Sequence, residues 1–254
     1  MVHQLLGRHA LVTGGGTGIG LAIALALAEA GAEVTITGRR ADVLNAAAKN
    51  EPRLHPAAMD VTDEASVVAA VKSAVDALGP LAICIANAGI AEGRALHKTD
   101  LAFWRKIMAT NLDGAYLTIR ECLSSMRGQD WGRVIAVSSI AGLKGLKGAP
   151  AYTASKHGLT GLIRALSEDY LGSPITFNAL CPAYVDTAII DQNVTAISTR
   201  AGISADEAMQ IMVGANRHKR LIAPSEVAAA AMWLCGPGSQ SVNGQCIEIA
   251  GGQI

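Results

Sequence analysis

The chain has 254 residues, of which half are hydrophobic and 17% are charged. This length suits one large α/β domain or two small ones, and the apolar content is too high for a disordered chain. The 21 basic and 21 acidic side chains give a formal net charge of zero, and only 4% of the residues are aromatic. These values argue against a protein that binds nucleic acid through a basic surface and stacking aromatics.

Short β-rich runs recur along the whole chain. They are mostly apolar at consecutive positions, which is typical of parallel strands covered by helices on both faces. The predicted strands are His9–Thr13, Glu33–Thr37, Leu54–Met59, Leu81–Ala86, Arg133–Ser138, Ile175–Cys181 and Cys246–Ile249.

Helical segments alternate with these strands. They are expected near Gly18–Ala30, Asp42–Lys49, Asp63–Leu78, Leu101–Arg127, Tyr152–Leu171 and Ser225–Cys235. Strand–helix alternation without a linker predicts one α/β domain over residues 1–254, a Rossmann-like doubly wound parallel sheet of about seven strands.

One segment interrupts this alternation. Between Thr187 and Arg220 the sequence predicts a helix over Ala205–Gly214 and no strand. An insertion of this length before the last strand is often a substrate lid, so residues 188–220 are predicted to form one. The alternative is a surface decoration.

The cysteines and histidines lack the spacing of metal ligands, so no metal site is predicted. Apolar neighbours favour buried, reduced thiols at Cys84, Cys122, Cys181, Cys235 and Cys246. Met1–Gly7 does not read as a secretion signal, and the apolar run Ile19–Ala28 is too short to span a bilayer. We therefore expect a cytoplasmic protein with no membrane or nucleic-acid partner.

A glycine-rich turn follows the first predicted strand and opens the first helix. Its motif is Gly14-x-x-x-Gly18-x-Gly20. Residues without a Cβ let the backbone approach a pyrophosphate, and the helix that follows offers free N–H groups and its positive end. The turn therefore predicts a dinucleotide site, and the alternative is a flexible turn without a ligand.

The end of the second predicted strand bears on which dinucleotide binds. An acidic residue there would bond the ribose 2′-hydroxyl, but the chain has Gly38 followed by Arg39 and Arg40. A guanidinium can pair with a 2′-phosphate, so NADP(H) is favoured and NAD(H) is possible. Asp60, with the Val61 backbone, is placed to contact the adenine; alternatively Asp60 is a helix N-cap.

Tyr152 and Lys156 are four residues apart, which places both on one face of a predicted helix. An ammonium near a phenol lowers the phenol pKa and makes it a usable acid and base. Ser139 ends a strand at the edge where ligands of parallel sheets gather, and its hydroxyl can hold a substrate oxygen. Asn111 is a polar amide within a mostly apolar helix, so it needs a partner and can bend that helix.

These motifs, in this order and spacing, resemble the short-chain dehydrogenase/reductases over essentially the full chain. The resemblance rests on Thr13-Gly14-x-x-x-Gly18-x-Gly20, Asn87-Ala88-Gly89, Asn111, Ser139, Tyr152-x-x-x-Lys156, and Pro182 before Val185-x-Thr187. Departures are Ala86 in place of a first asparagine, Ala183 after Pro182, and Thr17 where many NADP-dependent members carry a basic residue.

The resemblance implies a role for each matching residue. Tyr152 would be the acid/base, Lys156 would tune it and bind the nicotinamide ribose, Ser139 would orient the substrate, and Asn111 would hold a relay water. The residues it assigns to the cofactor are Thr13, Gly14, Gly16, Thr17, Gly18, Ile19, Gly20, Asn87, Ala88, Gly89, Pro182, Val185 and Thr187. It also implies a homotetramer built through the two long helices.

The resulting hypothesis is hydride transfer between NADP(H) or NAD(H) and a carbonyl/secondary alcohol pair. The C-terminal third loosely resembles 3-hydroxybutyrate dehydrogenases and 3-oxoacyl or polyketide ketoreductases, which suggests a 3-oxoacyl or 3-hydroxy acid derivative. Lys144, Lys147 and Arg217–Arg220 are either a basic rim for an acidic substrate or ordinary surface charges. The alternatives are a nucleotide-sensing regulator and an epimerase or dehydratase that retains its cofactor.

Overall fold

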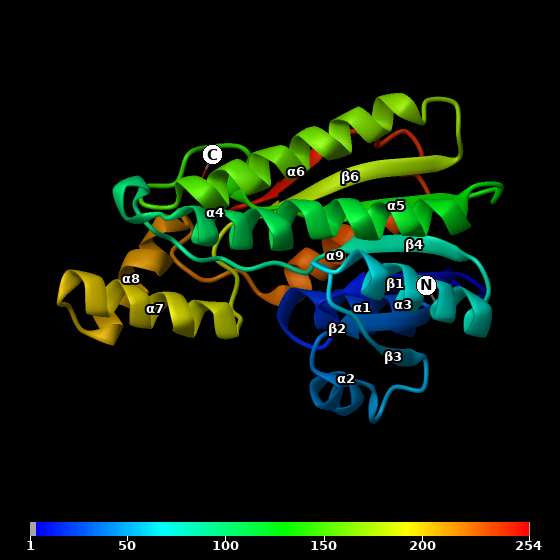
Figure 1. The fold of residues 1–254 in the computed structure, drawn as a ribbon, viewed down its shortest axis with the longest axis horizontal. Coiled ribbons are helices and arrows are strands. Elements are labelled where there is room, and N and C mark those ends of the chain that lie inside the picture. Colours follow the sequence, from blue (N-terminus) through cyan, green and yellow to red (C-terminus); the bar gives the residue numbers. More distant parts are fainter. Residues whose placement is uncertain (1–3, 254) are drawn as a thin grey trace.

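Seven strands form one sheet at the centre of the protein (Figure 1). The computed structural model describes residues 4–253. The strand order is β3-β2-β1-β4-β5-β6-β7, and every neighbouring pair is parallel. The strands are β1 (His9–Thr13), β2 (Glu33–Gly38), β3 (Leu54–Ala58), β4 (Leu81–Ala86), β5 (Gly132–Val137), β6 (Ile175–Pro182) and β7 (Cys246–Ile249). The predicted doubly wound α/β fold is confirmed.

Two hydrophobic cores lie on opposite faces of this sheet. Consecutive residues of β1 alternate between them, so Leu11 belongs to one core and Val12 to the other. One face packs on α1 (Gly18–Glu29) and α9 (Pro224–Cys235), and the other on α3 (Glu64–Leu78), α5 (Gly114–Met126) and α6 (Pro150–Asp169). Helix α2 (Ala41–Ala48) lies beside β2 and β3 (Figure 1).

The strand order reverses between β1 and β4, so the crossovers after these two strands lead in opposite directions. At such a point the carboxyl ends of the strands leave a crevice, where ligands of this fold class bind. The Thr13 hydroxyl accepts hydrogen bonds from the backbone N–H groups of Asn87 and Ala88, both at 2.9 Å. This contact fixes the ends of β1 and β4 to each other at the crevice.

The long helix predicted over Leu101–Arg127 is not regular. It consists of α4 (Leu101–Met108), a π-helical turn over Ala109–Asp113, and α5. The side chain of Asn111 within this turn bonds both backbone groups of Ile90, at 2.8 and 3.0 Å. The π turn widens the helix where its amide must reach a neighbouring loop, as such turns often do at functional positions.

The segment before α9 holds two helices where the sequence predicted one. These are α7 (Ala188–Ala201) and α8 (Ala205–Ala215), and α7 is the element that the sequence missed. Its run of β-branched and polar residues has low helix propensity, so packing stabilises it. Ile190 and Val194 of α7 bury against Ala208 and Met212 of α8. The pair projects beyond the carboxyl edge of the sheet (Figure 1).

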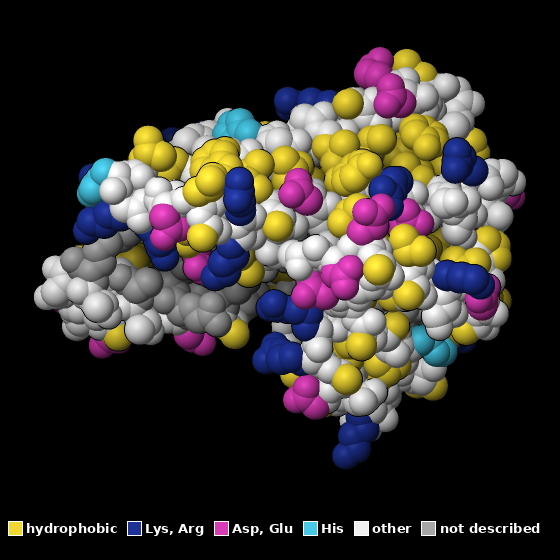
Figure 2. All heavy atoms as spheres, in the orientation of Figure 1, with side chains coloured by type: hydrophobic (Ala, Val, Ile, Leu, Met, Phe, Trp, Pro, Cys, Tyr) yellow, Lys and Arg dark blue, Asp and Glu magenta, His cyan; other side chains and the backbone are white. Residues whose placement is uncertain are grey.

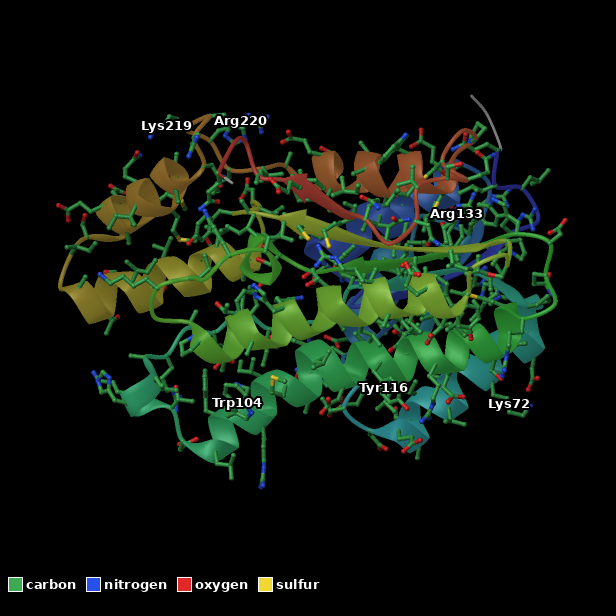
Figure 3. The ribbon with its side chains drawn as sticks, turned by 90° about the horizontal axis from the view of Figure 1, so that it is seen from above. Lys72, Trp104, Tyr116, Arg133, Lys219 and Arg220 are labelled. Carbon is green, nitrogen blue, oxygen red and sulfur yellow. The ribbon has the colours of Figure 1, made fainter. Side chains whose placement is uncertain are left out.

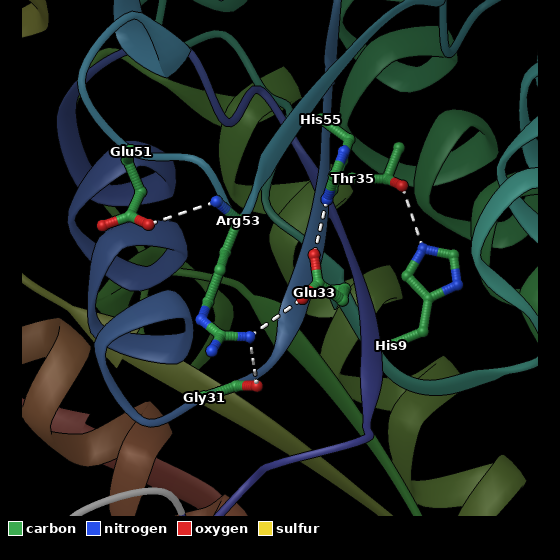
Figure 4. Close-up of polar contacts among 7 residues, drawn as sticks. All are labelled: His9, Gly31, Glu33, Thr35, Glu51, Arg53 and His55. Carbon is green, nitrogen blue, oxygen red and sulfur yellow. Dashed lines mark hydrogen bonds and ion pairs between the residues drawn. The ribbon is translucent and has the colours of Figure 1, made fainter.

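A polar cluster occupies the opposite, amino-terminal edge of the sheet (Figure 4). Glu33 accepts from Arg53 at 2.9 Å and contacts the His55 ring at 2.7 Å. The His9 ring bonds the Thr35 hydroxyl at 2.9 Å. These contacts join β1 to β2 and β2 to β3 near the starts of the strands, far from the crevice.

Candidate active site

A pocket of about 400 Å³ opens at the carboxyl edge of the sheet, between the strand ends and α7–α8. Most residues assigned from the sequence lie in its wall, from elements that are distant in the chain. They are Gly14, Thr17, Gly18, Ile19, Asn87, Ala88, Gly89, Ser139, Tyr152, Lys156, Pro182, Val185 and Thr187. The tertiary fold therefore brings the two predicted sites, for dinucleotide and for catalysis, into one cavity.

Other assigned residues do not line this pocket. Thr13 and Asn111 lie directly behind its wall, both 1% exposed. Gly16 packs against the α2 side chains, since a Cβ there would lie 3.1 Å from Val43. The remaining ones lie in or beside the glycine loop or further along the strand edge: Gly20, Gly38, Arg39, Arg40, Asp60 and Val61.

Steric crowding requires glycine at both ends of the loop. Gly14 has a φ of 63°, in the left-handed region that glycine tolerates. A Cβ on Gly20 would lie 2.3 Å from the Gly14 carbonyl oxygen and 2.5 Å from the Asn87 amide nitrogen. The loop is therefore folded tightly onto the first turn of α1.

The first turn of α1 is open to the pocket. Thr17 is its N-cap by position but makes no side-chain capping bond, and the first turn holds no acidic residue. Thr17, Gly18 and Ile19 all line the pocket. Unpaired N–H groups and the positive end of the helix dipole suit a pyrophosphate, so these residues fit a dinucleotide.

Ser139 and Tyr152 meet in the wall of the pocket. Ser139 lies just beyond β5, and Tyr152 lies in the first turn of α6. Desolvation is the largest effect on the phenol and raises its pKa, whereas the nearby Ser139 hydroxyl lowers it. The expectation that Lys156 lowers the Tyr152 pKa is wrong for the protein without ligands, because desolvation raises that pKa and Lys156 does not offset it.

Lys156 is a buried cation, 4% exposed. Its Nζ donates to the Val137 carbonyl at 2.9 Å and lies 6.0 Å from the centre of the Tyr152 ring. Burial disfavours the ammonium and lowers the Lys156 pKa to about 8. The two side chains do lie on one face of α6, as their spacing predicted.

Gly89 provides the space in which Asn111 and Lys156 approach each other. A Cβ on Gly89 would lie 3.2 Å from the Asn111 amide oxygen and 3.6 Å from Lys156 Nζ. The Asn111 amide nitrogen also donates to the Ser155 hydroxyl at 3.1 Å. Ser155 is fully buried, and the sequence reasoning did not single it out. Its position inside the Tyr-x-x-x-Lys motif was the available signal.

At the outer end of β2, Arg39 and Arg40 are exposed. Figure 2 shows Lys and Arg side chains gathered on this side of the molecule.

The Asp60 carboxylate accepts two bonds from Thr62, at 3.0 and 2.8 Å, which with the nearby Arg39 lower its pKa. Asp63, not Asp60, is the N-cap of α3, so the N-cap alternative for Asp60 is wrong.

The sequence left two readings for Lys144, Lys147 and Arg217–Arg220, a basic rim or ordinary surface charges, and the pocket lining favours the second for all but Lys147. Lys144 donates to the Gln253 carbonyl at 2.9 Å, and Arg220 pairs with Glu226 at 2.5 Å. Of the basic residues proposed for the rim, only Lys147 lines the pocket. The outer wall includes apolar side chains that the sequence did not single out, namely Tyr184, Ile190, Ile197 and Met212. Their approach depends on the fold of α7 and α8, which no local motif signals.

Neither a membrane span nor a metal cluster is found within residues 4–253. No helix in that range has both the length and the apolar character needed to cross a membrane. The same residues contain no group of three metal-capable side chains. All five cysteines are free thiols, and Cys246 is the only one of them that is not fully buried.

One pocket combines a glycine loop that fits a dinucleotide with Ser139, Tyr152 and Lys156. This combination is typical of a nicotinamide-dependent oxidoreductase. The short chain dehydrogenase family model matches residues 8–197, and the chain belongs to this family. It is an NAD(P)-dependent oxidoreductase that acts on CH–OH groups and small-molecule substrates.

Three relatives illustrate the range of the family. The cis-4-hydroxycyclohexanecarboxylate dehydrogenase of Sinomonas cyclohexanicum is 36% identical over 76% of this chain and 74% of its own. The acetoacetyl-CoA reductase of Rhizobium meliloti is 34% identical over 98% of this chain and 99% of its own. A variant of the actinorhodin polyketide ketoreductase, solved with NADPH, has a TM-score of 0.95 at 30% identity, covering 100% of this chain and 99% of the other.

Proposed function

We propose that this enzyme reduces a ketone, or oxidises the matching secondary alcohol, with Tyr152 as the acid/base. The observation that carries the proposal is that Ser139 and Tyr152 line the same pocket wall, with Lys156 Nζ 6.0 Å from the centre of the Tyr152 ring. A hydroxyl pair of this kind can hold one carbonyl oxygen from two sides. Ser139 then orients that oxygen, and Tyr152 donates the proton.

The raised pKa of Tyr152 supports this direction of proton transfer. The phenol stays protonated at neutral pH and is ready to donate to a carbonyl. When it does so, the Lys156 ammonium stabilises the phenolate by its charge. A Lys156 pKa of about 8 keeps that ammonium populated at pH 7.

Asn111 contributes by position. Both hydrogens of its amide nitrogen are used, by Ile90 and Ser155, and its oxygen accepts from the Ile90 N–H. One lone pair of that oxygen is left, beside Lys156 Nζ across Gly89. We assign to it the binding of a water that returns protons to Lys156.

NADP(H) supplies or accepts the hydride at its nicotinamide ring. We infer a preference for NADP(H) over NAD(H) from Gly38, which offers no carboxylate, and from exposed Arg39 and Arg40 beside it. The glycine loop and the first turn of α1 would hold the pyrophosphate, Asn87–Gly89 would support the cofactor from below, and Val185 and Thr187 would contact the carboxamide. Fluorescence titration with both cofactors tests this: Arg39→Asp is expected to shift the preference toward NADH, and tighter wild-type binding of NADH refutes it.

The substrate portion of the pocket favours an apolar ketone. Ile190, Ile197 and Met212 line it from α7 and α8. We propose a 3-oxoacyl or 3-hydroxy acid derivative, with residues 188–220 acting as a lid over it. Hydrogen exchange is expected to slow in α7 and α8 when NADP+ and the ketone, a pair that cannot react, are added together, and unchanged exchange contradicts the lid.

A homotetramer built on α4, α5 and α6 is proposed for the assembly. Figure 2 shows hydrophobic side chains gathered over this side, and Trp104 and Tyr116 lie along the outer side of α4 and α5 (Figure 3). Tyr116 is 46% exposed and Leu101 is 60% exposed. Light scattering tests the assembly, and a monomeric mass at micromolar concentration refutes it.

Kinetics of Tyr152→Phe test the reaction itself. The variant keeps the ring and loses the proton, so ketone reduction is expected to fall by about 10²–10⁴-fold while NADPH binding persists. Equal turnover by variant and wild type removes the acid/base assignment. Consumption of one NADPH per ketone separates this reaction from an epimerase or dehydratase, which leaves the cofactor unchanged overall.

A further inference from the structure

The loop between β5 and α6 presents a lysine to the pocket. Lys147 lines the cavity and is exposed, whereas Lys144 of the same loop is directed to the Gln253 carbonyl. The backbone N–H of Ala149 bonds the Leu146 carbonyl at 3.2 Å, which closes a β-turn with Lys147 and Gly148 at its tip. Gly148 has a φ of 74°, as the third residue of a type II turn requires.

The turn is fixed from two sides. The backbone N–H of Leu146 donates to the Thr153 hydroxyl at 3.3 Å, which ties the turn to the start of α6. On the other side, a Cβ on Gly93 would lie 3.1 Å from the Gly148 carbonyl oxygen, so the turn abuts the loop after β4. Lys147 is therefore held at the mouth of the pocket by its backbone.

The charges around the mouth leave Lys147 unopposed. Glu92, which also lines the pocket, pairs with Lys106 at 2.5 Å. Arg94 is 3.8 Å from Asp100 and stacks on Phe103. Among the side chains that the structure describes, the lining cations outside an ion pair are Lys147 at the mouth and Lys156 in the interior. The cavity is thus mainly apolar with a single positive charge at its opening.

We propose that Lys147 determines substrate specificity by binding an anionic group, a carboxylate or a phosphate, at the pocket mouth. The inference rests on the proposed ketone reduction and defines its substrate. The reacting carbonyl lies at Ser139 and Tyr152, the apolar body lies against Ile190, Ile197 and Met212, and the anion remains at the solvent edge. An ion pair at such a partly apolar rim is stronger than one on an open surface.

Two pairs of ketones test the charge and identify its source. The first pair is 4-oxocyclohexanecarboxylate and its methyl ester, and the second is acetoacetyl-CoA and the acetoacetyl thioester of N-acetylcysteamine. Lys147→Met is expected to raise KM for the anionic member about tenfold, with the neutral member unchanged. If only 4-oxocyclohexanecarboxylate shows the raised KM, the bound anion is a carboxylate. If only acetoacetyl-CoA shows it, the bound anion is a phosphate.

Matched variants separate charge from folding. Lys147→Arg is expected to retain most of the wild-type KM, and Lys144→Met, altered in the same loop outside the pocket, is expected to match wild type. The wild-type preference for the anion should weaken as NaCl is raised. An equal loss for neutral and anionic ketones, or no loss for either anion, overturns the proposal.

Calorimetry with cyclohexanecarboxylate, which has no carbonyl to reduce, separates this proposal from the reaction it rests on. Binding to wild type that is lost in Lys147→Met supports the anion site even if no ketone is turned over, in which case the proposed reaction alone fails. Binding that is independent of Lys147 removes the anion site whatever the kinetics show.

Discussion

Lys156→Met is expected to make the protein more stable. The ammonium is 4% exposed and has one hydrogen bond, to the Val137 carbonyl. Burial lowers its pKa from 10.5 to about 8. Since a tenfold change in an equilibrium constant corresponds to about 1.4 kcal/mol, this difference destabilises the charged folded protein by about 3 kcal/mol.

Methionine fills a similar volume without the charge, but it leaves the Val137 carbonyl without its donor. That loss costs about 1 to 2 kcal/mol. The net gain is therefore about 1 to 2 kcal/mol, or roughly 2 to 8 °C in Tm for a chain of this length. The variant is expected to lose reductase activity because the phenolate of Tyr152 loses its cation.

The pH dependence identifies the cause. The folded pKa lies below the unfolded one, so between pH 8 and 10.5 the unfolded state binds more protons and wild-type stability rises with pH relative to the variant. The advantage of Lys156→Met is thus complete below pH 8 and shrinks above it.

Thermal melts from pH 7 to 9.5 measure this difference. Lys72→Met is the control, because Lys72 is exposed on α3 with only a surface pair to Asp76 (Figure 3), and its Tm is expected to change by about 1 °C or less. A Lys156→Met protein less stable than wild type at pH 7, or a difference that does not vary with pH, refutes the reasoning.

Three further predictions follow from packing and burial. Gly20→Ala places a Cβ against the Gly14 carbonyl oxygen and is expected to weaken NADPH binding. The control Gly214→Ala, whose Cβ meets no neighbouring atom, is expected to bind NADPH like wild type. Equal NADPH affinities of the two variants would contradict the packing argument. Burial lowers the His9 pKa, so the unfolded chain takes up a proton before the folded protein does. Stability is therefore expected to fall as the pH drops below 6.5. Denaturation at pH 7.5 and 5.5 should show a smaller pH effect in His9→Asn. The fully buried Asn216 amide holds the backbone of Tyr184 at the pocket wall, so Asn216→Ala is expected to raise the ketone KM without changing the NADPH Kd; parallel changes in both would indicate a general loss of structure.

Much of the fold could be predicted because its signals are local. Strands buried on both faces are continuous apolar runs, and the ranges predicted for β1 and β4 match at both ends. The edge strand β7 is only partly buried, and its predicted range also matches at both ends. Helix α7 could not be predicted, because its stability comes from Ile190 and Val194 packing on α8 rather than from its own propensity. The π turn at Asn111 likewise depends on a loop some twenty residues earlier.

Local sequence was enough to single out the candidate groups: the glycine loop that must lack side chains, and Tyr152 and Lys156 one helical turn apart. Their electrostatic environment, in contrast, depends on how the chain folds around them. Desolvation raises the pKa of Tyr152 and lowers that of Lys156, because the fold surrounds both with segments that no i,i+4 spacing reveals. The tertiary structure also decided which basic side chains reach the pocket, since Lys144 and Arg220 find partners elsewhere and Lys147 does not.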